Sequence, residues 1–257
     1  MISHPNVKIN LGLHVLRRRN DGFHDIETVF LPYDGYSDTL EIYPADTLSI
    51  SVEGPCYTGW DPCSDLVFKA WELLADECGI PPVGIRLCKT SPVGAGLGGG
   101  SSDAVAALKM MDEIFGLGLG RDRLLGFAGR LGSDCSFFVD NEPRFAEGKG
   151  EILSEAPVNV DAYEIRVAVP EGESVSTKEA YSGIVPRNLR PDIGLSLREV
   201  LALPVPEWRD VLHNDFEDTV FPAHPAIARL KQRFYDEGAV YASMSGSGSA
   251  VFGLFEK

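Results

Sequence analysis

Residues 91 to 103 form the part of the chain whose composition is best suited to chemistry. They read Ser91-Pro92-Val93-Gly94-Ala95-Gly96-Leu97-Gly98-Gly99-Gly100-Ser101-Ser102-Asp103. Glycine lets the backbone approach a ligand closely, and the free N–H groups at the start of a helix attract negatively charged groups. The segment therefore predicts a phosphate-binding loop, and the alternative is a flexible linker or a strained turn.

Two common kinds of phosphate loop do not account for this segment. Gly94, Gly96 and Gly99 match the G-x-G-x-x-G pattern of dinucleotide-binding folds, but no acidic residue follows at the end of a second parallel strand. The Walker pattern fails because no lysine precedes Ser101. The loop is therefore predicted to belong to a third class of nucleotide-binding site.

The loop lies between two well-defined expected elements. A strand is expected over residues 83–88, and a helix is expected from Ser101 or Ser102 to Gly116. Alternating apolar residues predict further strands over residues 7–15, 39–43, 47–52 and 163–169. In the first of these, Lys8 and Asn10 are expected on the face opposite the core, so that the strand is half-buried.

Further helices are expected where apolar residues recur at helical spacing. One is expected to start at Ser64 and end at Gly79, and a short one over residues 133–139 has Ser133 as its expected cap. Three others are expected over residues 121–131, 208–220 and 224–237. The chain closes with an expected strand, a tight Gly/Ser turn and a second strand. The pattern predicts an α+β fold of two lobes, with a boundary near residue 153.

The charge balance limits the kinds of partner. The 257 residues include 23 Lys and Arg against 38 Asp and Glu, a formal net charge of −15. Such a chain repels nucleic acid backbones and anionic membranes, so that neither is expected as a partner. A small anionic ligand stays compatible with the sequence, because local N–H groups and one lysine can outweigh the distant net charge.

The five cysteines predict neither a metal centre nor a disulfide framework. They include no CxxC pair and no Cys/His cluster. The first residues, Met1 to Pro5, lack the charged and apolar regions of a signal peptide. The expected location is therefore the cytoplasm.

Three segments together resemble the signatures of the GHMP superfamily of small-metabolite kinases, which includes galactokinase, homoserine kinase and mevalonate kinase. Pro92 to Asp103 resembles its ATP motif, P-x-G-[AG]-G-L-G-G-G-S-S. Residues 8–11 resemble its N-terminal strand, and residues 244–252 resemble its C-terminal Gly/Ser turn. The resemblance implies a mixed α/β lobe over residues 1–153, which carries the ATP loop, and a smaller ferredoxin-like α+β lobe over residues 154–257.

Within the superfamily, the chain is most similar to the family of 4-diphosphocytidyl-2-C-methyl-D-erythritol kinases of the non-mevalonate isoprenoid pathway. The similarity rests on residues 6–11, 21–24, 131–138 and 145–151. Phe23 stands where this family more often has Tyr, Cys135-Ser136 replaces a common Val-Pro pair, and Asp65 stands where Asn is common. The family implies ATP-dependent phosphorylation of a small molecule, at the 2-hydroxyl of a cytidine diphosphate-linked methylerythritol.

The resemblance also implies which residues bind ATP and which act on the substrate. It places ATP against Pro92, Val93, Gly94, Ala95, Gly96, Leu97, Gly98, Gly99, Gly100, Ser101 and Ser102. Mg²⁺ is expected to accompany ATP, with Ser102 as a ligand. Asp134 is the implied base, and Lys8 is expected close to it, where it stabilises developing negative charge. Local pattern alone favours the alternatives, which are a helix-start carboxylate for Asp134 and an ordinary solvated side chain for Lys8.

Four residues are candidates for substrate binding. Phe23 and His24 match the family positions that line the cytosine slot, and the spacing of Tyr181 suggests that it forms the opposite wall. The alternatives are a core aromatic for Phe23 and a turn residue bonded to backbone for His24. Asn10 either orients the substrate or bonds to a neighbouring strand.

Two other functions stay open at this point. One is a different kinase of the superfamily, such as homoserine kinase, which should lack the segment Asp21-Gly22-Phe23-His24. The other is a non-catalytic nucleotide-binding relative, which should have lost Lys8 or Asp134. Nothing in the sequence indicates an oligomeric state.

Overall fold

The computed structural model describes residues 1–186 and 194–257. The chain divides into two compact units, each assembled from separate segments. The first consists of residues 1–7, 34–93 and 98–142, and the second of residues 8–33, 94–97 and 143–257. The lobes expected from the sequence are contiguous, and their boundary near residue 153 stays a prediction. In the described ranges, no helix is long and apolar enough to cross a membrane.

A four-stranded sheet forms the base of the first unit, in the order β1-β4-β6-β5. The strands are β1 (Ile2–Ser3), β4 (Thr39–Pro44), β6 (Val83–Cys88) and β5 (Ser49–Glu53). β4 is antiparallel to β1 and β6, whereas β5 is parallel to β6. Leu40 pairs with Leu87 and Ile42 with Ile85, and all four side chains are buried. The strands expected at 39–43, 47–52 and 83–88 are confirmed.

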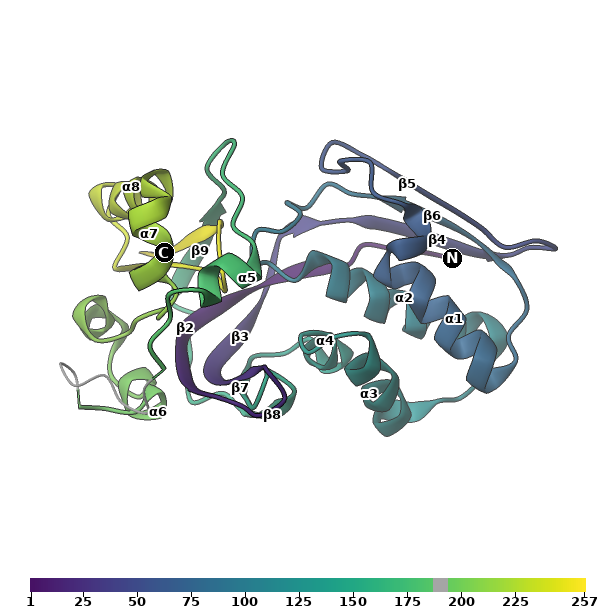
Figure 1. Cartoon of the computed structure of the whole chain (residues 1–257), viewed down its shortest axis with the longest axis horizontal. Coiled ribbons are helices and arrows are strands. Elements are labelled where there is room, and N and C mark those ends of the chain that lie inside the picture. Colours follow the sequence, from purple (N-terminus) through teal and green to yellow (C-terminus); the bar gives the residue numbers. More distant parts are fainter. Residues whose placement is uncertain (187–193) are drawn as a thin grey trace. The chain divides into compact units, whose positions relative to one another are not determined.

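Four α-helices cover this sheet on one side. They are α1 (Leu66–Cys78), α2 (Gly99–Phe115), α3 (Gly120–Leu131) and α4 (Cys135–Asp140). α1 and α2 lie nearest to the sheet, and α3 and α4 lie beyond them (Figure 1). α1 buries Val67, Ala70 and Leu74 at helical spacing, whereas α2 is buried around most of its circumference.

Two expected helix starts in this unit are wrong. Pro62 begins a separate 3₁₀ turn, η1 (Pro62–Ser64), and the Ser64 hydroxyl donates to the Asp61 carbonyl there. Asp65 caps α1 instead, because its carboxylate accepts from the Val67 N–H at 2.9 Å. Ser133 lies in a turn before α4 and does not cap it, since the residue next to the helix is Asp134.

The described residues of the second unit form two sheets. One has the order β2-β3-β7-β8, with β2 (Asn6–Arg18), β3 (His24–Ser37), β7 (Arg144–Glu147) and β8 (Ile152–Glu155). The other is antiparallel, in the order β10-β11-β9, with β10 (Tyr241–Met244), β11 (Val251–Glu256) and β9 (Tyr163–Ala168). The expected Gly/Ser hairpin and the strands at 7–15 and 163–169 are confirmed. β2 is not half-buried as expected, because Lys8, Asn10 and His14 on its polar face are also buried.

The helices of the second unit are short except for the last. They are α5 (Thr177–Tyr181), α6 (Leu197–Leu201), η2 (Val205–Asp210), α7 (Glu217–Ala223) and α8 (Pro225–Asp236). α8 begins with proline, and it packs on β10 and β11. The single helix expected over 208–220 is wrong: Pro206 lies in the 3₁₀ turn η2, and Asn214 and Asp215 bond to backbone groups instead of continuing a helix.

Candidate functional site

The middle of the glycine-rich loop lies against the C-terminal Gly/Ser turn, within the second unit. The Ala250 N–H donates to the Ala95 carbonyl at 3.1 Å. The Ser245 hydroxyl donates to the Gly96 carbonyl at 3.1 Å and accepts from the Asn10 N–H at 3.1 Å. Three segments far apart in the sequence, which carry the three signature motifs, therefore meet at Gly96.

The contact at Gly96 requires a residue without a side chain. Gly96 has a left-handed backbone, with φ +78°, and an added Cβ would lie 2.1 Å from the Ser245 carbonyl oxygen. Gly94 has a similar backbone, with φ +68°, but a Cβ there would meet no atom within 4 Å. Gly96 is therefore fixed by a close backbone approach, whereas Gly94 leaves open space beside the loop.

Lys8 is held at the same place by the loop and by Asn10. Its Nζ donates to the Gly96 carbonyl at 3.0 Å and to the Asn10 amide oxygen, and its N–H donates to the Leu97 carbonyl at 2.9 Å. The Asn10 amide nitrogen donates to the Thr28 hydroxyl on β3 at 3.1 Å. Asn10 thus bonds to the neighbouring strand, and it also fixes the direction of the Lys8 ammonium group.

The Gly/Ser turn is supported by a cluster of polar residues that the sequence analysis did not identify, Asn214 and Glu217. The Asn214 amide donates to the carbonyls of Met244 and Gly246, at 2.8 Å each. The Glu217 carboxylate accepts from the Met244 N–H at 2.8 Å and from the Ser243 hydroxyl at 2.9 Å. The sequence signal was the Asn214-Asp215 pair, which suits backbone capping better than a helix interior.

The start of α2, in the first unit, forms the other part of the loop. Gly98 precedes the helix with a left-handed backbone, φ 71°, and the Ser102 N–H donates to its carbonyl at 3.0 Å. The first N–H groups of a helix lack intrahelical acceptors and therefore favour an anion. Ser102 is buried, in the first turn. The expected helix is confirmed, although it begins at Gly99.

Asp134 is half-buried immediately before α4, also in the first unit. Its side chain makes no capping hydrogen bond to the helix, so capping does not explain its position. The neighbouring Cys135 thiol is buried, and burial raises its pKa to about 11, which keeps it protonated and unreactive. Lys8 belongs to the second unit, and its expected closeness to Asp134 stays a prediction.

The structure brings His24 and Tyr181 together in the second unit. Their rings stack with centroids 4.5 Å apart and an interplanar angle of 14°, and Tyr181 packs edge-on against Phe216. Burial, and then the positive charge of Arg18, lower the pKa of His24, which favours the neutral imidazole. Phe23 is 55% exposed, with the Lys149 ammonium 4.8 Å from its ring centre, so it is not a core aromatic.

An ionic clip holds the helix that carries Tyr181. The His224 ring bonds to Glu173 at 2.6 Å through Nδ1 and to Glu179 of α5 at 2.9 Å through Nε2. The Glu179 hydrogen bond, followed by that of Glu173, raises the pKa of His224. The clip therefore joins the start of α8 to α5 most firmly when His224 is protonated.

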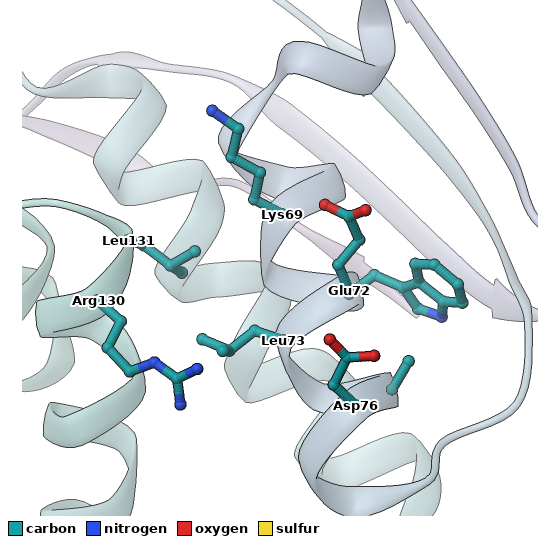
Figure 2. A pocket seen from close by; sticks show the side chains of 8 residues that line it. Lys69, Glu72, Leu73, Asp76, Arg130 and Leu131 are labelled. Atoms are coloured by element: carbon teal, nitrogen blue, oxygen red, sulfur yellow. The ribbon is translucent and has the colours of Figure 1, made fainter.

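A separate groove lies on the first unit between α1 and α3. Lys69, Glu72, Leu73 and Asp76 line it from α1, and Arg130 and Leu131 from α3 (Figure 2). Its charged side chains carry both signs, and it contains none of the predicted site residues. Nothing in its lining selects one class of ligand.

Two family models match the chain. The model described as GHMP kinases N terminal domain matches residues 65–141, which include the whole glycine-rich loop and Asp134. The model described as GHMP kinases C terminal matches residues 198–257, which include the Gly/Ser turn and its supporting cluster.

Curated relatives match over the full length of the chain. It is 47% identical to 4-diphosphocytidyl-2-C-methyl-D-erythritol kinase of Bacteroides thetaiotaomicron, covering 100% of this chain and 92% of the relative. It is 44% identical to the protein of that name from Cytophaga hutchinsonii, covering 99% and 92%. A crystal structure of 4-(cytidine 5′-diphospho)-2C-methyl-D-erythritol kinase superimposes with a TM-score of 0.79 at 32% identity, covering 99% and 90%.

The Gly96→Ala variant tests the close approach at Ser245. Because the new Cβ would overlap a backbone oxygen, we expect a loss of unfolding free energy of about 1–3 kcal/mol beyond that of Gly94→Ala. Both variants carry the cost of a left-handed alanine, so their difference isolates the contact. Urea unfolding measures it. Equal stability of the two variants would show that Gly96 and Ser245 do not touch.

The His224 clip predicts a pH-dependent stability. Its pKa is raised in the folded chain, so its contribution is full below about pH 6.5 and is lost as the pH rises through the raised value. We expect the stability advantage of the native chain over His224→Gln to shrink as the pH is raised from about 6.5. His4→Gln is the control, because the partner of His4 is the Thr39 hydroxyl and not a carboxylate. An advantage that stays constant with pH contradicts the clip.

Proposed function

The chain belongs to the GHMP kinase family and, within it, to the 4-diphosphocytidyl-2-C-methyl-D-erythritol kinases, and we propose that it transfers the γ-phosphoryl group of ATP to the 2-hydroxyl of 4-(cytidine 5′-diphospho)-2-C-methyl-D-erythritol. Family membership confirms the expected α+β GHMP kinase fold. The observation that carries the proposal is the meeting of the glycine-rich loop, Lys8 and the Gly/Ser turn at Gly96. Full-length relatives favour this substrate over homoserine.

The glycine-rich loop is the proposed site of the ATP phosphates. Residues 95–97 are anchored by their carbonyl groups, and α2 follows with its N-terminal N–H groups. Anchoring through carbonyls leaves the loop N–H groups as the hydrogen-bonding groups for phosphate oxygens. The positive end of the long, buried α2 adds to this attraction.

Ser102 fits the proposed role of a Mg²⁺ ligand in part. It is buried in the first turn of α2, and a serine hydroxyl can serve as a ligand of Mg²⁺ beside a bound nucleotide. Among the residues that the structure describes, no three His, Cys, Asp or Glu side chains gather into a metal site. Mg²⁺ bound with ATP would neutralise the charge of its phosphates.

Asp134 is the proposed base and Lys8 the proposed electrostatic partner. The Asp134 carboxylate would take the proton of the substrate's 2-hydroxyl while the oxygen of that hydroxyl attacks the γ-phosphorus of ATP. The bond between the γ-phosphorus and the oxygen of the β-phosphate would break and release ADP. Lys8, oriented by Asn10 and the Gly96 carbonyl, would stabilise negative charge on the transferring group. This division of roles needs Asp134 ionised and the Lys8 ammonium fixed in direction.

The cytosine ring is proposed to bind beside Phe23, His24 and Tyr181. Tyr181 is fixed on one side by Phe216, and Phe23 is exposed and free of the core. The neutral imidazole of His24 has both a donor and an acceptor nitrogen for the edge of a base.

The cytoplasmic location and the absence of a nucleic acid partner stay predictions, the latter based on the net charge of −15.

The Asp134→Asn variant tests the proposed base. We expect kcat to fall by about 10²–10⁴-fold while ATP affinity stays unchanged, because only proton transfer is lost. Asp122→Asn on α3 is the control, since that side chain is 99% exposed. Turnover near that of the native chain would exclude Asp134 as the base.

Lys8→Met extends the same test to the proposed pair. If both residues act on one reaction step, the double variant with Asp134→Asn should lose much less than the product of the two single losses. Losses that multiply fully would place the two residues in separate steps or sites. Steady-state kinetics of the four proteins gives the answer.

Competition by cytidine nucleotides tests the substrate. CDP should compete with the alcohol substrate and not with ATP, and Phe23→Ala should raise KM for that substrate by about 10- to 200-fold, as expected from lost base stacking. Phe23→Tyr, which keeps an aromatic ring, should stay close to the native chain. No competition at millimolar CDP, or faster phosphorylation of homoserine than of any cytidine-linked alcohol, would contradict the assignment.

A further inference from the structure

A buried ionic network lies at both ends of the glycine-rich loop, within the first unit. Lys89 stands just before the loop, and Asp103, the last residue of the loop segment 91–103, is the fifth residue of α2. The Lys89 ammonium donates to the Asp103 carboxylate at 2.6 Å and also to Asp38. All three side chains are at most 3% exposed. One lysine therefore joins the two ends of the loop through opposite charges.

Asp38 is the acceptor that organises this network. Its Oδ1 accepts from the N–H groups of Thr90 and Ser91, at 2.7 and 2.8 Å. Its Oδ2 accepts from the Ser91 hydroxyl and from the Lys89 ammonium. A single carboxylate, placed at the junction of β3 and β4, thus fixes the three residues that lead into the loop.

The first residue of α2 packs directly on this network. A Cβ added to Gly99 would lie 2.8 Å from the Ser91 hydroxyl oxygen, 3.5 Å from the Lys89 Nζ and 3.6 Å from the Asp38 Oδ2. The space beside the Ser91 hydroxyl is therefore too small for a side chain at position 99. The residues on either side of the loop touch, and the network sets the distance between them.

Stability alone does not explain such a network. Buried ion pairs require nearly ideal geometry and are often no more stabilising than apolar residues of the same volume. Here burial opposes ionisation strongly enough to raise the pKa of the Asp103 carboxyl to about 7, in spite of Lys89. What the network supplies is a fixed separation of the loop ends, which removes conformations that a ligand would otherwise have to exclude.

We propose that Asp38 is a positioning residue for nucleotide binding, which acts through Lys89, Ser91 and Gly99 to hold the two ends of the loop at the distance that suits ATP phosphates. The inference rests on the proposed kinase function. Asp38 acts on the loop and not on the transferred group. Its loss should therefore weaken ATP binding and leave the chemical step unchanged.

The first experiment compares Asp38→Asn with the native chain in steady-state kinetics and in ATP binding by calorimetry. We expect KM and Kd for ATP to rise by about 10- to 100-fold, as for the loss of hydrogen bonds to a charged group. We expect kcat at saturating ATP to stay within about twofold and KM for the alcohol substrate to be unchanged. An unchanged Kd for ATP, or a fall in kcat alone, would overturn the proposal.

Two controls separate positioning from loss of stability or of charge. Leu74→Ala creates a cavity under α1 in the same unit, and it should lower stability without changing KM for ATP. Glu41→Gln removes the carboxylate that pairs with Arg86 at the surface, across β4 and β6. It should change neither the stability nor KM for ATP. A rise in KM for ATP in Leu74→Ala equal to that of Asp38→Asn would reduce the network to a structural role.

A second experiment does not depend on the folding of Asp38→Asn. Gly99→Ala should raise KM for ATP because its methyl group overlaps the Ser91 hydroxyl. Ser91→Ala removes that hydroxyl, so the double variant should recover most of the lost affinity. No recovery would show that the ends of the loop are not set by this contact.

The native chain serves as the reference for both experiments. If it neither binds ATP nor phosphorylates the cytidine-linked alcohol, the proposed function fails. If it does both while the Asp38 and Gly99 variants bind ATP equally well, only the positioning role of Asp38 fails.

Discussion

The close approach of two backbones at Gly96 and Ser245 is the constraint on which the second unit of this kinase depends. It leaves no room for a Cβ, and it brings the glycine-rich loop to the Gly/Ser turn from nearly 150 residues later in the chain. The Lys8 ammonium bonds to the same Gly96 carbonyl. A displacement of the turn would therefore change the loop and the lysine together. The support by Asn214 and Glu217 prevents it, since both bond directly to the backbone of the turn.

Local pattern predicted the elements whose signal is periodic. The strands β4, β5 and β6 follow from alternating apolar residues, and α2 and α8 follow from helical spacing and their end residues, whereas the two-residue strand β1 was not predicted. The long strand β3 escaped, since Pro32 and Gly35 interrupt its pattern while its pairing with β7 depends on residues more than 100 positions away. The failed helix over 208–220 has a related cause: the Asn214-Asp215 pair was a local signal against a helix interior, but the distant backbone groups to which the two residues bond are visible only in the structure.

The candidate site was predictable where motifs carry it and not where single buried side chains do. The loop, Lys8 and the Gly/Ser turn were identified from three motifs, and the structure brings them together. Tyr181 was suggested by spacing, and its ring stacks on His24, while its part in binding the substrate stays a prediction. Asp38 gave no signal, because an aspartate between two strands has the sequence context of an ordinary turn. Its four donors come from residues 89–91, so its function is visible only in three dimensions.

A glycine-rich loop lets this strongly negative chain bind negatively charged phosphates. Its net charge is −15, and both proposed substrates carry phosphates. Additional lysines or arginines around the proposed base would attract them, but nearby cations lower the pKa of a carboxylate and weaken it as a proton acceptor. Backbone N–H groups and the start of α2 attract phosphates with partial charges whose effect fades within about one helical turn. Anion binding can then be strong at the loop without further cationic side chains there. The buried network at Asp38 serves this arrangement, because N–H groups bind an anion well only when the backbone that carries them is already in place.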